Sequence, residues 1–345
     1  MRRRHLATVL AAAAALVGTL TATAAPALAC AGLIGSNGAV NLGRTTTLAA
    51  YHEGVEYYVT AFQFAGGGGQ FGTLIPLPGI PSSVERGGSW TLQRLARETE
   101  PPRALRRDFA FGAVAESSAQ VILQTRVDAL YLTVLKGGAR EVATWATDHG
   151  FRLSPDAPEV LDFYAKRSPI FLAAVFDADA AAARGQRIGD GTPVQIAIPT
   201  TNPWVPLRIL SLGKQPGDRV EADVYLLTDQ QPAFLPDPRA GLALVHSAPA
   251  RPLLLNDLRS DERMEWVPQS AYLTKLRVDI RAADLAYDLA VDASGQGTPS
   301  RRAAGLDPVQ RPVQLDTLGG PAGFALLLLG LPLAVVLRRL SRHEA

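Results

Sequence analysis

Cys30 is the only cysteine in the 345-residue sequence, so any thiol chemistry depends on it. It follows Ala27-Leu28-Ala29, a small-x-small pattern that is typical of signal-peptide cleavage. Lipid attachment would need other residues before the cysteine, and no neighbouring charge would activate a thiol nucleophile. We therefore expect Ala27 and Ala29 to mark the cleavage site and Cys30 to begin the mature chain unmodified. The alternatives are lipidation of Cys30, or an intermolecular disulfide or reactive thiol.

Three aspartates form the best candidate for a metal site: Asp177, Asp179 and Asp190. Their carboxylates are hard oxygen ligands, which calcium prefers. The spacing departs from that of a calcium-binding loop and arginines lie between the acids, so a solvated loop is the alternative interpretation. The glycine run at 66–69 is not followed by the Lys-Ser/Thr pair of a phosphate loop. We expect neither a nucleotide nor another cofactor.

The histidines lack the sequence partners that catalysis would need. His52, His149 and His246 lie outside any HExxH motif, and the sequence holds no Gly-x-Ser-x-Gly elbow and no paired-cysteine zinc spacing. We expect structural roles for all three, although a triad can assemble from residues far apart in sequence. Trp204, within NPWVP, suits either a sugar-binding surface or a local hydrophobic core. The sequence therefore assigns no catalytic residue.

The composition fits a folded protein that does not bind nucleic acid. Hydrophobic residues make up 47% of the chain, enough for a sizeable core. The formal net charge is +2, but three arginines near each end supply it, and acidic residues outnumber basic ones between them. A body of this kind lacks the basic footprint that nucleic-acid binding requires.

Both ends have the character of targeting segments. Residues 1–29 combine a basic start, an apolar stretch and the cleavage motif, which predicts a secretory signal peptide. Residues 318–337 carry no charge and are long enough to cross the ~30 Å core of a bilayer as a single transmembrane helix. The arginines of residues 338–345 predict a cytoplasmic tail and an extracytoplasmic body. Residues 293–317 are rich in Gly, Pro and polar residues, so we expect a flexible stalk.

Residues 30–292 interleave strand and helix patterns irregularly, which predicts an α+β body with mixed β-sheets and a few packed helices. The sequence also allows two subdomains with a break near residues 100–125. The pattern at 48–64 predicts a hairpin that turns at Glu53-Gly54, and Asp156 is expected to cap a helix. Further strands are expected at 71–75, 129–135, 169–176, 194–198, 207–212 and 220–227, and helices at 90–99, at 139–149 and from 156.

Several stretches of the body, in order, resemble one bacterial family. They are the hairpin with the following FGTLIPLPGIPSSVERGG, then WATDHGFRLSPDAPEVLDFYAKRSPIFLAAVF, VQIAIPTTNPWVPLRILSL and YLTKLRVDIRAADLAYDLAV. Together they span about Ala39 to Asp292, and they are similar to exported bacterial proteins known only as domain of unknown function 2330. The resemblance implies an exported, anchored envelope protein. It implies no known activity, so no catalytic residue is carried over.

These observations favour a binding or structural module over an enzyme. The expected protein is held in the cell membrane by its C-terminal helix and displayed on the outside. Its partners would then be the membrane, other envelope proteins or polysaccharide, and not nucleic acid. The alternatives are an envelope hydrolase with dispersed catalytic residues, and an accessory subunit of a membrane complex.

Overall fold

The structure is a computed structural model that describes residues 32–35, 45–63, 71–99, 120–185, 191–294 and 297–307. The predicted signal peptide at 1–29, Cys30, the predicted span at 318–337 and the tail that follows lie outside these residues. The described residues up to Leu306 form one compact unit. Both large sheets contain strands from either side of residues 100–125, which favours a single body over two subdomains.

A seven-stranded sheet forms one half of the body, with the order β13-β14-β11-β2-β3-β9-β5. Its neighbouring strands pair antiparallel except for β2 and β11, which run parallel at the centre. The strands are β2 (Thr45–His52), β3 (Val55–Gln63), β5 (Ser83–Arg86), β9 (Gly191–Pro199), β11 (Arg219–Thr228), β13 (Leu242–Pro249) and β14 (Tyr272–Arg281).

A five-stranded antiparallel sheet forms the other half, with the order β1-β4-β8-β7-β6. A small third sheet, β10-β15-β12, joins three short segments. The strands of the two sheets are β1 (Gly32–Gly35), β4 (Phe71–Pro76), β6 (Gln120–Val127), β7 (Leu130–Lys136), β8 (Ile170–Phe176), β10 (Trp204–Val205), β12 (Ala233–Leu235) and β15 (Leu289–Asp292).

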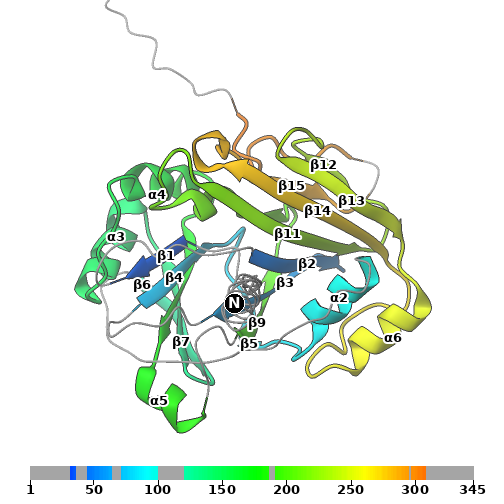
Figure 1. Cartoon of the computed structure of the whole chain (residues 1–345), viewed down its shortest axis with the longest axis horizontal. Helices are drawn as coiled ribbons and strands as arrows, with labels where there is room; N and C mark the ends of the chain where they lie inside the picture. The colour runs from blue at the N-terminus through cyan, green and yellow to red at the C-terminus, as the bar shows by residue number, and fades with distance from the viewer. Residues whose placement is uncertain are drawn as a thin grey trace, which may run out of the picture. The chain divides into compact units, whose positions relative to one another are not determined.

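The two large sheets pack face to face and helices cover their outer faces (Figure 1). One apolar cluster lies between the sheets and includes Leu172 of β8 and Leu226 of β11. A second cluster joins the outer face of the five-stranded sheet to α3 and α4, and a third joins the seven-stranded sheet to α2 and α6. The helices are α2 (Thr91–Thr99), α3 (Ala139–Asp148), α4 (Ala157–Ala165), α5 (Ala178–Ala183) and α6 (Pro252–Ser260). The predicted α+β class with mixed sheets is confirmed.

Two strand predictions are confirmed in detail. β2 and β3 form the expected hairpin, and both residues of its turn, Glu53 and Gly54, have positive φ angles of 50° and 82°. Positive φ at both central positions matches the right-handed twist of a hairpin. All residues of β8 are buried, as expected for a central strand covered on both faces.

The strand predicted at 207–212 is wrong, because residues 208–211 form the 3-10 helix η1 (Arg208–Ser211). Side chains replace a neighbouring strand as hydrogen-bond partners there. Asp288 accepts the backbone N–H groups of Leu207 and Arg208, and the Tyr164 hydroxyl accepts that of Ile209. These acceptors satisfy the backbone locally, so no sheet is needed.

The predicted cap at Asp156 is confirmed in position only, since Asp156 is the N-cap residue of α4. Helix α4 begins at the expected place, but Asp156 makes no side-chain hydrogen bond to it. Its carboxylate instead accepts the backbone N–H of Gly213 at 3.0 Å. A tertiary contact has therefore replaced the local one.

The predicted stalk begins too early, because residues 297–306 belong to the same compact unit as the body. Ala303 and Ala304 are buried, and Asp288 donates its backbone N–H to the Ala304 carbonyl at 3.0 Å. Arg302 donates to the Lys166 carbonyl at 2.7 Å at the end of α4. The segment 297–306, called the return segment below, is thus part of the body.

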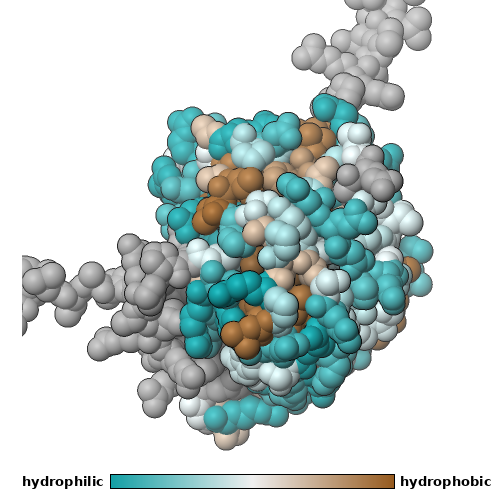
Figure 2. Space-filling model, turned by 90° about the vertical axis from the view of Figure 1, so that its right-hand side faces the viewer, coloured by the Kyte–Doolittle hydropathy of each residue, from teal (hydrophilic) through white to brown (hydrophobic). Residues whose placement is uncertain are grey.

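The surface beside α6 and β13 is mostly hydrophilic, with apolar side chains in small separate groups (Figure 2). β13 is an edge strand, and a bulge between Leu244 and His246 interrupts its pairing. Bulges of this kind discourage pairing with another chain. Among the helices of the described residues, none combines the length and apolar character needed to cross a membrane.

Candidate functional site

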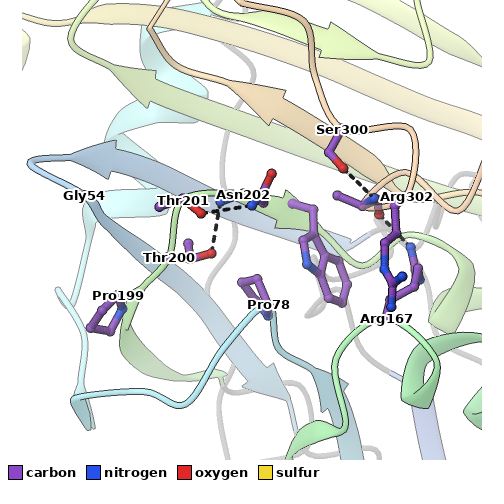
Figure 3. A pocket seen from close by; sticks show the side chains of 11 residues that line it. Gly54, Pro78, Arg167, Pro199, Thr200, Thr201, Asn202, Ser300 and Arg302 are labelled. Atoms are coloured by element: carbon purple, nitrogen blue, oxygen red, sulfur yellow. Dashed lines mark hydrogen bonds between the residues drawn. The ribbon is translucent and has the colours of Figure 1, made fainter.

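A pocket of about 670 Å³ opens where the hairpin turn, the end of β9 and the return segment meet (Figure 3). Its volume is typical of sites for small molecules. The lining residues are Gly54, Pro78, Arg167, Pro199, Thr200, Thr201, Asn202, Trp204, Ser300, Arg302 and Ala303.

The polar side of the pocket is formed where β9 leaves the sheet. Val55 of β3 pairs with Pro199 of β9, and Thr200 donates its backbone N–H to the Gly54 carbonyl at 3.1 Å. The chain then turns through Thr200–Asn202 into β10. The turn therefore projects two hydroxyls and an amide at the pocket.

The opposite side of the pocket rests on a buried ion pair. Arg167 Nη2 lies 2.5 Å from Asp288 Oδ2, and the two side chains are 8% and 0% exposed. Asp288 Oδ1 also accepts the Tyr164 hydroxyl at 2.8 Å, besides the backbone N–H groups of Leu207 and Arg208 at the start of η1. Burial raises the pKa of Asp288, and the Arg167 guanidinium opposes that rise. All these partners are donors, which an ionised carboxylate accepts.

Arg167 joins the helix layer to the return segment. Its Nη1 donates to the Ala303 carbonyl at 2.6 Å and its Nε to the Phe163 carbonyl at 3.2 Å. The guanidinium carbon lies 3.9 Å from the ring centre of Phe163 and 5.0 Å from that of Trp204. The hydrogen bonds to the two carbonyls and to Asp288 use three of the five N–H donors of Arg167. Two N–H donors are left for other partners.

Tyr164 is held as a neutral hydroxyl at the centre of this network. Burial, together with the charge of Asp288, raises its pKa well above the ordinary value. The hydroxyl donates to Asp288 and accepts the N–H of Ile209 at 2.8 Å. Tyr164 thereby couples α4 to η1 without adding a charge.

Glu56 is a buried carboxyl group next to the pocket wall. Its side chain shares the inner face of β3 with Tyr58, and its residue is 1% exposed. Oε2 accepts the backbone N–H of Trp204 at 3.3 Å, whereas Oε1 has no hydrogen-bond partner in the described part of the chain. Burial raises the pKa of Glu56 to about 8, so the group is mostly protonated at neutral pH.

The predicted metal ligands are only partly described. Asp177 is buried, binds Arg126 Nη2 at 2.8 Å and accepts the backbone N–H of Ala180 at 2.6 Å. Asp179 lies in α5 with its side chain outside the description, and Asp190 lies outside the described residues. The described part of the chain holds no group of three or more candidate ligands. The site at Asp177, Asp179 and Asp190 remains a prediction, as do the processing residues Ala27, Ala29 and Cys30.

The histidines occupy separate places. His149 ends α3, where its Nδ1 contacts the Trp145 carbonyl at 2.7 Å, and His246 follows the bulge of β13. His52 lies beside the hairpin turn, with Nδ1 2.6 Å from Asp229 Oδ1. No hydroxyl or thiol among the described residues is hydrogen-bonded to the other ring nitrogen of His52, so the pair does not form a triad.

Sequence reasoning identified Trp204 but missed the charged residues around it. The local-core interpretation of Trp204 is confirmed, since it is 3% exposed and stacks on Tyr164 with ring centres 5.7 Å apart. Glu56 and Asp288 each interrupt a strongly apolar or aromatic stretch. A charge within such a stretch is the signal that could have indicated a buried polar site.

Three solved structures of a baculovirus protein show low similarity. Baculovirus P35 in a mutated form after caspase cleavage is 7% identical, with a TM-score of 0.38 over 73% of this chain and 100% of that chain. P35 bound to caspase-8 is 9% identical, with a TM-score of 0.35 over 72% of this chain and 90% of that chain. P35 alone is also 9% identical, with a TM-score of 0.32 over 72% of this chain and 90% of that chain. These sequence identities and TM-scores are too low to assign any property of P35 to this chain.

No curated protein sequence matches the chain. A family model does match, over residues 24–292, which is most of the chain and nearly all of the body described above. The match confirms the resemblance noted from the sequence motifs. The chain therefore belongs to the family described as an uncharacterized protein conserved in bacteria, DUF2330.

Proposed function

We propose that the protein is a binding module of the bacterial cell envelope, exported by its N-terminal signal and held by its C-terminal apolar segment. The body would present the pocket on the outer side of the membrane. The signal-like start and the uncharged run at 318–337 followed by arginines support this arrangement.

The chemistry of the pocket lining supports binding over catalysis. The lining side chains of the described residues include two arginines, three hydroxyls and an amide, but no carboxylate, imidazole or thiol. General acid–base or nucleophilic catalysis depends on groups of the missing kinds in most enzymes. Hydroxyls, amides and guanidinium groups recognise a polar ligand without transferring its protons.

An envelope hydrolase is the second candidate, and the His52–Asp229 contact is the observation in its favour. An imidazole oriented by a carboxylate is the usual general base. A hydrolase of this kind should lose turnover of envelope polymers in His52→Ala while keeping their binding. The binding module should show no turnover in either the wild type or His52→Ala, and its binding should be unchanged in the variant.

The topology can be tested by protease treatment of intact cells that carry the protein with a C-terminal epitope. External protease should digest the body and leave the epitope attached to a short fragment, because the arginines retain residues 338–345 inside. A matched sample of permeabilised cells should lose the epitope as well. Loss of the epitope in intact cells, with the body preserved, would contradict the orientation.

The role of the pocket can be tested with Asn202→Trp, which places a large ring in the cavity. Full-length protein in detergent micelles should sediment with protein-free cell walls of the producing bacterium, and the variant should lose at least tenfold in affinity. Gln124→Trp is the control, since Gln124 is an exposed residue of β6 and does not line the pocket. Equal sedimentation of wild type and Asn202→Trp would reject the pocket as the binding site.

A further inference from the structure

The charge of the pocket is concentrated at one end. Arg167 is neutralised by Asp288, whereas Arg302 has no carboxylate within ion-pair distance among the described residues. Arg302 donates one hydrogen bond to the Lys166 carbonyl, which orients the guanidinium and leaves its other N–H donors available. The pocket therefore carries an uncompensated positive charge that an anionic group would match.

The other end of the pocket offers both donors and acceptors. Thr200 Oγ1 accepts the Asn202 backbone N–H at 3.1 Å, and Thr201 Oγ1 accepts Asn202 Nδ2 at 2.9 Å. Each hydroxyl acts as an acceptor here and so keeps its own O–H free to donate. The Asn202 side-chain oxygen remains as an acceptor. A ligand that carries several hydroxyls both donates and accepts, and so matches this end.

An apolar surface lies between the two ends. Figure 3 shows Pro78 between the Thr200–Asn202 turn and the two arginines. Pro199 and Trp204 add further apolar lining. Such surfaces contact the C–H faces of a ring, and the volume of about 670 Å³ holds a ligand of one or two sugar rings.

We propose that the pocket binds an acidic sugar, with its carboxylate or phosphate at Arg302 and its hydroxyls at Thr200, Thr201 and Asn202. This inference rests on the proposed function, because it names the ligand class of the same pocket. A neutral sugar would leave the Arg302 charge unmatched, and a simple anion would leave the hydroxyl end unused.

Isothermal titration calorimetry on the full-length protein in micelles tests the proposal with three probes. Digalacturonate carries carboxylates, glucose 6-phosphate carries a phosphate, and maltose is neutral. At least one acidic probe should bind tenfold or more tightly than maltose, since hydrogen bonds to charged groups are the stronger ones. The probe that binds more tightly identifies the anionic group.

Arg302→Gln should weaken binding of the preferred acidic probe by about tenfold or more and lower its sensitivity to salt. Arg301→Gln is the matched control, because Arg301 is the exposed neighbour that donates to Leu306 and does not line the pocket. Thr201→Val should weaken the binding of all three probes, because each of them carries hydroxyls.

Failure of this inference can be told apart from failure of the proposed function. If maltose binds as well as both acidic probes, or if Arg302→Gln binds as wild type does, the acidic-sugar assignment is overturned. The same holds if neither acidic probe binds at millimolar concentration. The binding role itself then depends on Asn202→Trp, and it survives if that variant no longer sediments with cell walls.

Discussion

Replacing Asp288 with alanine is expected to lower the free energy of unfolding by about 3–5 kcal/mol, the usual cost of removing one partner of a buried ion pair. Asp288 is fully buried and accepts from Arg167, Tyr164 and two backbone N–H groups. Its loss leaves a buried guanidinium without its counter-charge and frees the donors that hold η1. Chemical denaturation followed by tryptophan fluorescence would measure the change.

Asp279→Ala is the matched control for this prediction. Asp279 also binds an arginine, Arg219, but the side chains of the pair are 43% and 60% exposed. Exposed pairs contribute about 0–1 kcal/mol. In addition, Arg167→Ala should cost less in the Asp288→Ala background than in the wild type, because the charge is then already unpaired. If Asp288→Ala cost no more than Asp279→Ala, the ion pair would not stabilise the body.

Glu56→Gln is expected to make the protein more stable than the wild type at alkaline pH and less stable, by about 1–3 kcal/mol, in acid. The Glu56 carboxyl has a pKa of about 8 in the folded protein, against an ordinary value of 4.5. Between these values the folded state binds one more proton than the unfolded chain, so the free energy of unfolding falls as pH rises. The contribution of the protonated Glu56 carboxyl to the free energy of unfolding is fully present below pH 4.5 and lost above pH 8.

The size of this effect follows from the pKa difference. One unit corresponds to about 1.4 kcal/mol, so the wild type should lose about 5 kcal/mol across the interval relative to Glu56→Gln. The glutamine adds an amide whose unpaired N–H groups cost about 1–3 kcal/mol, but equally at every pH. Denaturation curves from pH 4.5 to 9 should therefore diverge. Glu221→Gln, at an exposed position of β11, should run parallel to the wild type, and parallel curves for Glu56→Gln would refute the assignment.

Local patterns in the sequence were sufficient for much of the fold. The hairpin turn at Glu53-Gly54, the buried strand β8 and the helix α3 all follow from turn chemistry or hydrophobic period. These features depend on residues close together in the chain. The same local evidence failed at 207–212, where the partners that decide the backbone are Tyr164 and Asp288.

The candidate site could not be derived in this way, since its parts come from distant segments. Arg167 at the end of α4 meets Asp288 and the Ala303 carbonyl more than a hundred residues later. The return segment has the composition of a linker, and only its contacts with Arg167 and Lys166 show that it belongs to the body. The composition of the return segment reports its own conformational preference, whereas its burial depends on residues that lie far away in the sequence.

The parallel pairing of β2 with β11 has a consequence for the order of folding. The partner of Thr45 is Ala222, so the centre of the seven-stranded sheet closes only after most of the chain is available. Contacts between such distant residues slow folding, because a long loop must close before they form. A chain that emerges from its N-terminus must hold the β2–β3 hairpin with one long edge unpaired until β11 arrives. During that interval the edge is open to pairing with other chains. Binding of a chaperone to this early hairpin would therefore protect the chain from aggregation while it is being made.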